Sequence, residues 1–333
     1  MPPTVTVIVV ALGARASLKR ALASIPEGCE VIVVDHGHPL GRPVVEGDLP
    51  RGARLVRADR NRGFGAGCNE GARLAGGELL LLLNPDAELE PGAVETLVAR
   101  IERDEAIGVV GGRLLRPDGS DELSFGRRPR PWDLLVIALR LDGFARLFPW
   151  LGSFRMAAAD RSAPAAPHWV SGALLLIPAT IFRRVAGFDE RFFMYCEDVY
   201  LCERVRASGS EVAYEPSARA HHRGGGTGPP WSARRHVEHW RSWRIYWGLR
   251  GLPGAPIVAL TALAGAIRVV ESLPVALFMG AAAASERIRC GLGLIRLSLT
   301  GPKRPSQRGA EGGFLEHVRS RTAKEAPDAA DLQ

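Results

Sequence analysis

Lysine is nearly absent from this 333-residue chain: of its 43 basic residues only Lys19, Lys303 and Lys324 are lysines, and 43 minus 3 leaves 40 arginines. With 36 acidic residues, the formal net charge is +7. Much of the excess lies in residues 219–250, where seven arginines accompany one acid, Glu238. Guanidinium groups are always charged and bind phosphate oxygens through paired N–H groups. The composition therefore indicates an anionic partner, and nucleic acid, a membrane surface and a nucleotide diphosphate all remain open.

Cysteine pairs and a secretory leader are also missing. The five cysteines form no CxxC pair, and their odd number in apolar surroundings is typical of reduced, buried thiols. The N-terminus has no basic segment and no small-residue cleavage site around its first apolar run, so no signal peptide is expected. With 46% hydrophobic and 24% charged residues, the composition also excludes disordered, collagen-like and disulfide-rich miniprotein classes. We expect a cytoplasmic globular protein.

Uncharged runs long enough to span a bilayer comfortably are likewise absent. The longest such C-terminal runs, 251–267 and 272–285, have 17 and 14 residues, at and below the usual lower limit. Arginines flank both runs. They could be helices buried against the protein, or helices lying in the headgroup layer with arginines on lipid phosphates. Both alternatives remain open with about equal weight, because apolar segments this short are ambiguous.

The first 112 residues alternate between β-rich and helix-like segments. The β-rich segments are 4–11, 30–35, 54–57, 79–84 and 107–110, and the helix-like ones are 14–24, 66–75 and 91–103. This alternation predicts an α/β fold with a mostly parallel sheet covered on both faces. Ligands of such sheets bind beyond the carboxyl ends of the strands. The polar residues placed there are Asp35 and the Asn84-Pro85-Asp86 segment.

The rest of the chain is less regular at first. Residues 116–167 are rich in proline and predict an insertion or lid around an apolar, helical section at 132–148. A second ordered block follows, with a strand at 169–177 and helices near 179–185 and 197–208. Beyond residue 227 the pattern predicts helices, and the tail after 302 is polar and expected to be flexible.

Two groups of acids are candidates for chemistry. Asp86 follows the most hydrophobic strand, where a carboxylate can bind Mg²⁺ or Mn²⁺ together with substrate phosphates. A turn or helix-capping role is an equally weighted alternative. Four carboxylates then fall within ten residues: Asp189, Glu190, Glu197 and Asp198. The last two stand at a predicted helix start, where the helix dipole favours an ionised base, although simple capping is the commoner reason for acids there.

Three further patterns are weaker. His221 and His222 precede three glycines and Thr227, a combination that suits a metal or a phosphate, yet taken locally a solvated loop is favoured. The glycine-rich residues 61–69 follow a later strand, whereas a Rossmann dinucleotide loop must directly follow the first one. An aromatic stripe with flanking arginines at 234–247 could stack nucleic-acid bases, but a helix packed on its own domain is favoured.

Six segments in register resemble family 2 inverting glycosyltransferases, specifically the rhamnosyltransferase-like group. The resemblance covers about residues 5–227. The segments are VVD at 33–35, NRGFGAGCNEG from 61, LLLNPDAEL from 81, VSGALLLIP from 170, GFDERFFMYCEDVYLCERV from 187 and PSARAHHRGGGT from 216. Each is weak or moderate alone, whereas six in the family's order and spacing are specific.

The resemblance implies a GT-A fold and transfer of a sugar, such as rhamnose, from a nucleotide diphosphate donor with inversion. It places Asp35, Asn61 and Gly63 at the nucleotide, and Asp86 and His222 at the diphosphate and its Mg²⁺ or Mn²⁺. Asp198 corresponds to the catalytic base. Asp189, Glu190 and Glu197 would bind or orient the acceptor. The expected partners are a nucleotide-diphosphate sugar, a glycan or polyprenyl-linked acceptor and an anionic membrane surface at the inner face of the cell membrane, with no nucleic acid.

The implied organisation has four parts. Residues 1–112 form the nucleotide-sugar half, 113–228 the acceptor-binding and catalytic half, 229–301 a helical extension that includes the membrane-contact candidates, and 302–333 a flexible tail. The chain departs from the family at Asp35-His36-Gly37-His38 and at Tyr200, which replaces a second acid. A noncatalytic glycan- or nucleotide-sugar-binding protein of the same fold is the alternative. A sugar-phosphate nucleotidyltransferase is disfavoured because its basic, glycine-rich signature is absent after Val10.

Overall fold

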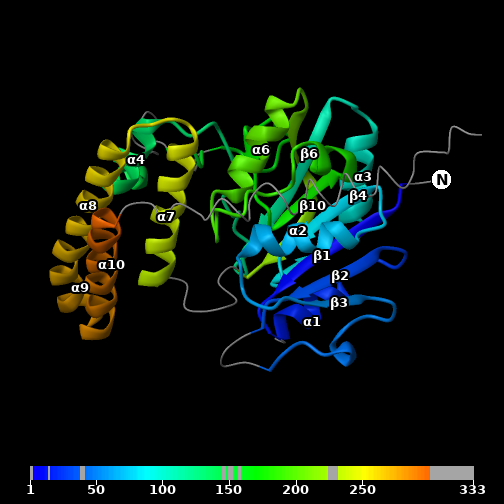
Figure 1. The fold of residues 1–333 in the computed structure, drawn as a ribbon, viewed down its shortest axis with the longest axis horizontal. Coiled ribbons are helices and arrows are strands. Elements are labelled where there is room, and N and C mark those ends of the chain that lie inside the picture. Colours follow the sequence, from blue (N-terminus) through cyan, green and yellow to red (C-terminus); the bar gives the residue numbers. More distant parts are fainter. Residues whose placement is uncertain are drawn as a thin grey trace, which may run out of the picture.

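The computed structural model describes residues 3–13, 16–37, 42–144, 148, 153–156, 159–223 and 232–300. In Figure 1 the sheet and the helices that cover it form one side of the molecule. A group of helices, α4 and α7 to α10, forms the other side. The predicted flexible tail and the glycine segment with Thr227 lie outside the described residues.

The sheet has eight strands in the order β3-β2-β1-β4-β9-β6-β10-β5. The strands are β1 (Val5–Ala11), β2 (Glu30–Asp35), β3 (Arg54–Arg57), β4 (Leu79–Leu83), β5 (Ala87–Leu89), β6 (Ile107–Leu115), β9 (Leu174–Pro178) and β10 (Glu211–His222). Neighbours are parallel from β3 to β4 and between β6 and β10, whereas β9 runs antiparallel to β4 and β6 and β5 antiparallel to β10. The predicted mostly parallel α/β sheet is confirmed.

One predicted strand proves to be two. The segment expected at 169–177 divides into β8 (Trp169–Val170), which pairs with β7 (Phe125–Gly126) in a separate two-stranded sheet, and β9. The break follows from hydrogen bonding, because the Ser171 amide donates to the Ser124 carbonyl and the Gly172 amide to the Asp198 carboxylate. The Ser171 amide thereby joins the small two-stranded sheet, and the Gly172 amide serves the candidate site.

Helices bury both faces of the sheet. They are α1 (Ala16–Ala23), α2 (Phe64–Leu74), α3 (Ala93–Glu102), α5 (Ala179–Arg184) and α6 (Glu197–Ala207). Alternate residues of the central strands enter different cores: Leu80 and Leu82 of β4 belong to one apolar cluster, Leu81 and Leu83 to the other. This two-sided burial explains why β4 is a run of five leucines, since side chains of successive strand residues point to opposite faces.

The C-terminal region is helical, as predicted. Its helices are α7 (Ala233–Leu249), α8 (Gly254–Val270), α9 (Ser272–Met279) and α10 (Ala281–Leu299), with α4 (Pro131–Ala138) from the middle of the chain packed on α8. Trp240, Trp243 and Trp247 of α7 are 1–3% exposed. The aromatic stripe is therefore packed inside the protein, as the favoured alternative predicted.

The two apolar C-terminal runs follow each other almost without interruption. By length and composition, Gly254–Leu277 is the one described segment that could cross a membrane, with 33% of its most apolar window buried. Large apolar side chains project from this region into solvent: Val270, Leu273, Leu277 and Met279 are 67–83% exposed. The region thus combines a packed inner face with an exposed apolar outer face.

Candidate active site

A cavity of about 670 Å³ opens beside the carboxyl ends of β1 and β4. It is lined by six residues that the sequence predicted: Asn61, Gly63, Asp86, Glu197, Asp198 and His222. Asp35, Asp189 and Glu190 are not among its lining residues. Segments separated by more than a hundred residues therefore meet at one site, as expected for polar residues that follow strand ends.

Asp86 and His222 form a polar pair in the cavity lining. Asp86 lies just beyond β4 and His222 ends β10, and their Oδ1 and Nε2 atoms are 3.2 Å apart. The other ring nitrogen, Nδ1, lies 2.6 Å from Oε2 of Glu122. Although burial lowers it, hydrogen bonds to Asp86 and Glu122 raise the pKa of His222 to about 10. Without a competing cation, the imidazolium therefore bridges two carboxylates.

The donor set fits a divalent cation. The Asp86 carboxylate oxygen and the His222 ring nitrogen lie 3.2 Å apart, so both residues could bind the same divalent cation. Glu122 would orient the ring through its second nitrogen, an arrangement common at metal-bound histidines. Within the described residues no group of three or more His, Cys, Asp or Glu side chains is arranged to hold a metal. The remaining ligands would have to be water and substrate oxygens, as is usual for Mg²⁺.

Asp35 organises the loops behind the cavity. Its Oδ1 accepts hydrogen bonds from the amides of Gly13 and Gly37 at 3.0 and 2.9 Å, and its Oδ2 accepts one from Val44 at 3.0 Å. The carboxylate is 3% exposed, while the neighbouring His36 lines the cavity. Asp35 thus joins the ends of β1 and β2, and any contact with a nucleotide stays a prediction.

Gly63 begins the wall formed by α2. Its φ of +99° is unfavourable for other residues, and a Cβ there would lie 2.0 Å from the carbonyl oxygen of Phe193. The Asn61 side chain accepts from the Gly63 amide at 2.9 Å, and the Phe64 amide donates to the same Phe193 carbonyl. The close approach brings the Asn61 turn against the segment that leads to Asp198.

Asp198 enters the cavity from the first turn of α6. The two residues just before α6, Tyr195 and Cys196, have φ values of +71° and +64°, which non-glycine residues rarely adopt. Such strain costs about 1–3 kcal/mol per residue and is concentrated at functional sites. The carboxylate is held by the amides of Gly172, at 3.2 Å from Oδ2, and Val199, at 2.8 Å from Oδ1.

Two neighbouring carboxyls have raised pKa values. Burial raises the pKa of Asp198, and the amides of Gly172 and Val199 oppose this. Burial and then the charge of Asp198 hold the pKa of Glu197 well above its usual range. Glu197 is 6% exposed, and its Oε2 has no hydrogen-bond partner in the described part of the chain. A carboxylate with a raised pKa beside a carboxyl whose pKa is raised further is suited to proton transfer.

Asp189 and Glu190 have other partners. Asp189 binds the side chain of Arg191, with Oδ2 2.5 Å from Nη2. Glu190 lies 3.2 Å from Arg62 and accepts a hydrogen bond from Asn69 at 3.1 Å. These contacts link the turn before Asp198 to α2. Of the four clustered acids, only Glu197 and Asp198 line the cavity.

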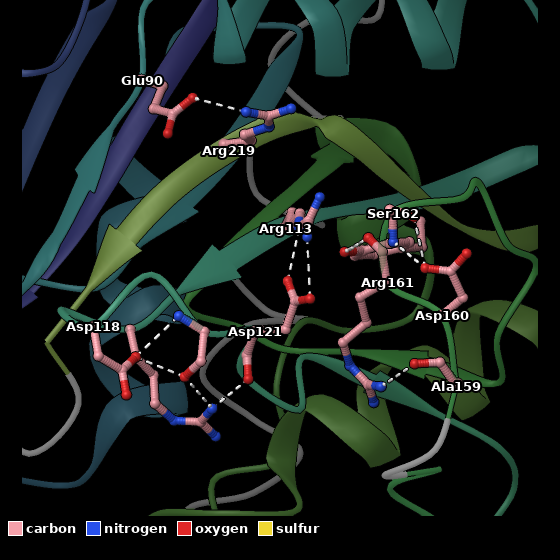
Figure 2. A network of polar contacts seen from close by, with 12 residues as sticks. Glu90, Arg113, Asp118, Asp121, Ala159, Asp160, Arg161, Ser162 and Arg219 are labelled. Atoms are coloured by element: carbon pink, nitrogen blue, oxygen red, sulfur yellow. Dashed lines mark hydrogen bonds and ion pairs between the residues drawn. The ribbon is translucent and has the colours of Figure 1, made fainter.

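Sequence reasoning did not find Glu122 or the basic wall of the cavity, which includes Arg155 and Arg235. These residues belong to no recognised motif. Glu122 and Arg155 fall in the segment interpreted only as an insertion or lid, and Arg235 in the aromatic stripe. Figure 2 shows the polar network of that insertion, including the paired contact of Arg113 with Asp121. The arginine-rich composition is the one sequence signal that pointed toward Arg155 and Arg235, and no signal pointed toward Glu122.

Comparison with known proteins identifies the family of the chain. Residues 6–161 match the family model "Glycosyl transferase family 2". The chain is 30% identical over 283 residues to the N-acetylglucosaminyl-diphospho-decaprenol L-rhamnosyltransferase of Mycobacterium tuberculosis (strain CDC 1551 / Oshkosh). That alignment covers 75% of this chain and 91% of the relative.

Two solved structures share the fold. The mannosyltransferase of Pyrobaculum calidifontis in complex with GDP-Man and Mn²⁺ superimposes with a TM-score of 0.50 at 16% identity, covering 90% of this chain and 87% of that one. GalNAc-T7 with UDP, GalNAc and Mn²⁺ superimposes with a TM-score of 0.50 at 16% identity, covering 72% of this chain and 47% of the other. The protein has a GT-A fold with a C-terminal helical region and belongs to glycosyltransferase family 2, in its rhamnosyltransferase-like group.

Proposed function

We propose that this protein is an inverting, metal-dependent glycosyltransferase of cell-surface polysaccharide synthesis. It would transfer a sugar, with rhamnose the first candidate, from a nucleoside diphosphate to a glycan or polyprenyl-linked acceptor. One observation supports this most: the same cavity contains the Asp86–His222 pair and the carboxylate of Asp198. The acceptor class follows the Mycobacterium tuberculosis relative, whose name specifies a sugar on diphospho-decaprenol.

Asp198 would act as the base. It would accept the proton of the acceptor hydroxyl while that oxygen forms a bond to the anomeric carbon. The bond from this carbon to the diphosphate breaks on the opposite face, so the configuration inverts. The backbone amides that bind both Asp198 oxygens would fix the orientation of the base during proton transfer. The raised pKa of Asp198 brings it closer to the working pH, which favours general base catalysis.

The donor would bind at the other end of the cavity. Its nucleotide would lie along Asn61 and Gly63, in loops that Asp35 holds together, and its diphosphate at Asp86 and His222. A Mg²⁺ or Mn²⁺ ion bound by these two residues would neutralise negative charge developing on the departing diphosphate. Glu197 would contact the acceptor beside Asp198, and Asp189 and Glu190 would act indirectly by holding the turn before it.

The test of this function is a screen of the purified protein against dTDP-, UDP- and GDP-sugars with Mg²⁺ or Mn²⁺ and a polyprenyl diphosphate-linked sugar. We expect nucleoside diphosphate release that depends on acceptor, and a product whose anomeric configuration, determined by NMR, is opposite to that of the donor. Retention of configuration would contradict the mechanism. Binding without release, with any acceptor, would favour the noncatalytic alternative.

The exposed apolar face of the C-terminal helices supports a peripheral position at the cytoplasmic face of the membrane. Leu273 and Leu277 of α9 are 71% and 83% exposed. Residues 254–299 carry four arginines and two glutamates, a net charge of +2. Apolar side chains beside basic ones are typical of protein surfaces that contact anionic lipid. We therefore assign this face to the membrane that would carry the acceptor.

Vesicle sedimentation tests the membrane assignment. Leu277→Glu should weaken binding to vesicles containing anionic lipid by several-fold, because it removes apolar burial and adds a negative charge. The matched control is Leu74→Glu in α2, where the leucine is also exposed, at 40%, but lies in the sheet region. Equal vesicle binding by wild type and Leu277→Glu would exclude this face.

A further inference from the structure

Arginine side chains line the cavity beyond Asp198. Arg155 precedes the insertion's last segment and Arg235 lies in the first turn of α7, and both line the same cavity as Asp198. Their charges oppose the increase that burial causes in the pKa of Tyr195, another lining residue. The charge of Arg155 also lowers the pKa of Asp198. Both guanidinium groups therefore act on the region around the proposed base.

A series of contacts runs along the wall of the cavity. The side chain of Asn84 lies 3.1 Å from the ring of His222, and its backbone amide donates to the carbonyl of Ala173. The backbone amide of Gly172, the residue before Ala173, donates to Asp198. The ring of Tyr195, just before Asp198 in the chain, lies 5.2 Å from that of His239, and His239 lies against Arg155. These contacts connect the Asp86–His222 pair to Arg155 by way of the segments that hold Asp198.

The backbone that carries Arg155 is held in place by a buried arginine. The guanidinium of Arg161 donates to the carbonyls of Arg155 and Ala159 at 2.9 Å and lies 4.6 Å from the ring centroid of Phe125. Arg161 is 3% exposed, and Figure 2 shows its contact with Ala159. The hydrogen bonds of the Arg161 guanidinium therefore fix the position of the backbone that carries Arg155.

The side chain of Arg155 is oriented without being neutralised. Its Nη2 lies 3.3 Å from Nε2 of His239. Burial, followed by the charge of Arg155, keeps the pKa of His239 well below its usual range, so the imidazole is neutral and accepts this hydrogen bond. Among the described residues, no carboxylate lies within 4.0 Å of the Arg155 guanidinium, whereas Arg62 and Arg191 are paired with acids. Arg155 therefore lines the cavity without a direct ion pair to any described carboxylate.

We propose that Arg155 and Arg235 form a diphosphate-binding subsite for the acceptor, separate from the Asp86–His222 pair proposed for the donor diphosphate. This inference rests on the proposed transferase function. Guanidinium groups bind phosphate oxygens through paired hydrogen bonds, and a lipid-linked acceptor carries its diphosphate next to the sugar that receives the transfer. The subsite would place the acceptor hydroxyl at Asp198 and would distinguish lipid diphosphate sugars from neutral glycosides.

The arrangement of the helices agrees with an acceptor that carries a lipid. Arg235 and His239 lie on α7, and α7 packs on α8 and α10, which contribute to the exposed apolar face. Figure 1 shows α7 between the sheet and these outer helices. The same helix thus borders both the polar cavity and the region assigned to the membrane, so a diphosphate group would be bound near the place where its lipid chain leaves the protein.

Two acceptor probes of equal chain length test the subsite: an alkyl diphosphate-linked N-acetylglucosamine and the corresponding neutral alkyl N-acetylglucosaminide. Binding is measured by calorimetry, so that the result does not depend on turnover. For Arg155→Gln and Arg235→Gln, the Kd of the diphosphate probe should rise by about tenfold or more, because charge-assisted hydrogen bonds are lost. The Kd of the neutral probe and of the free nucleoside diphosphate with Mn²⁺ should change by less than about twofold.

The control is Arg234→Gln, which removes the same charge from the preceding, exposed residue of α7 and should leave all three affinities unchanged. Arg155→Lys should restore part of the diphosphate affinity. An equal loss for both acceptor probes, or no loss for either, would overturn the proposal. If nucleoside diphosphate binding weakens instead, the arginines belong to the donor site. A protein that binds the diphosphate probe through these arginines yet transfers no sugar would contradict the proposed function but not the subsite.

Discussion

The two proposed subsites of the cavity are built in different ways. The proposed donor end consists of residues that directly follow sheet strands, such as Asp86 after β4, together with His222 at the end of β10. The proposed acceptor end consists of Arg155 in an insertion and Arg235 and His239 in a C-terminal helix. A sheet imposes the positions of strand ends through its hydrogen-bonded register, whereas the second wall depends on packing between distant segments. Substitutions at the two ends should therefore have separable effects, with Asp198 at the junction.

The largest effect is expected at this junction. Asp198→Asn should lower kcat by about a thousandfold, because it removes the proton acceptor while preserving shape. Affinity for the nucleotide sugar should be nearly unchanged in calorimetry. Asp104→Asn, the same change at a distant turn, is the control. Transfer near the wild-type rate would show that Asp198 is not the base, and a parallel loss of donor affinity would show that the two ends are not separable.

At the donor end, Asp86→Ala should weaken metal-dependent binding of the nucleoside diphosphate by about tenfold to a hundredfold, because charge-assisted and metal-mediated contacts are lost. Titration with and without Mn²⁺ measures this, and binding of the diphosphate acceptor probe should not change. Calorimetry that shows the same metal-dependent affinity as the wild type would remove Asp86 from the metal site.

Glu122 offers a finer test of the same end. Glu122→Gln replaces the carboxylate 2.6 Å from Nδ1 of His222 and should raise the Mn²⁺ concentration needed for half-maximal activity by about tenfold. The maximal rate at saturating metal should be largely retained. Glu95→Gln, on the exposed surface of α3, is the control. An unchanged metal requirement would mean that Glu122 does not orient a metal ligand.

The smallest effect concerns stability beside the base. Burial raises the pKa of Glu197 in the folded protein, so the folded state retains a proton that the unfolded chain releases. Stability therefore falls as pH rises from the ordinary glutamate range through the raised pKa. Relative to wild type, Glu197→Gln should gain about 1 kcal/mol of unfolding free energy between pH 5 and pH 8, measured by urea denaturation. If the free energies of unfolding of wild type and Glu197→Gln change with pH in parallel, the raised pKa of Glu197 is contradicted.

Much of the fold was predictable because the relevant signals are local. Five β-rich segments in the first 112 residues correspond to strands, and the leucine run at 79–83 is the central strand β4. The break between β8 and β9 was missed, because only the short Ser171-Gly172-Ala173 segment separates two apolar runs, and the hydrogen bonds of Ser171 and Gly172 reveal the interruption. Asp189 and Glu190 do not line the cavity, because closeness to Asp198 in the sequence does not decide which side chains face it. Their role in acceptor binding stays a prediction.

The sequence by itself determined the α/β alternation, the family motifs and the residue types of the site, because strand periodicity and short motifs are encoded by neighbouring residues. Only the tertiary structure decided that Glu122 contacts His222, a hundred residues away, and that Arg155 and His239 share a wall of the cavity. These contacts join segments whose separation in the chain carries no periodic signal. They arise because packing the insertion, α7 and β8 against one another buries apolar surface, including Phe154 and Trp243, and places polar side chains of these segments in the cavity lining.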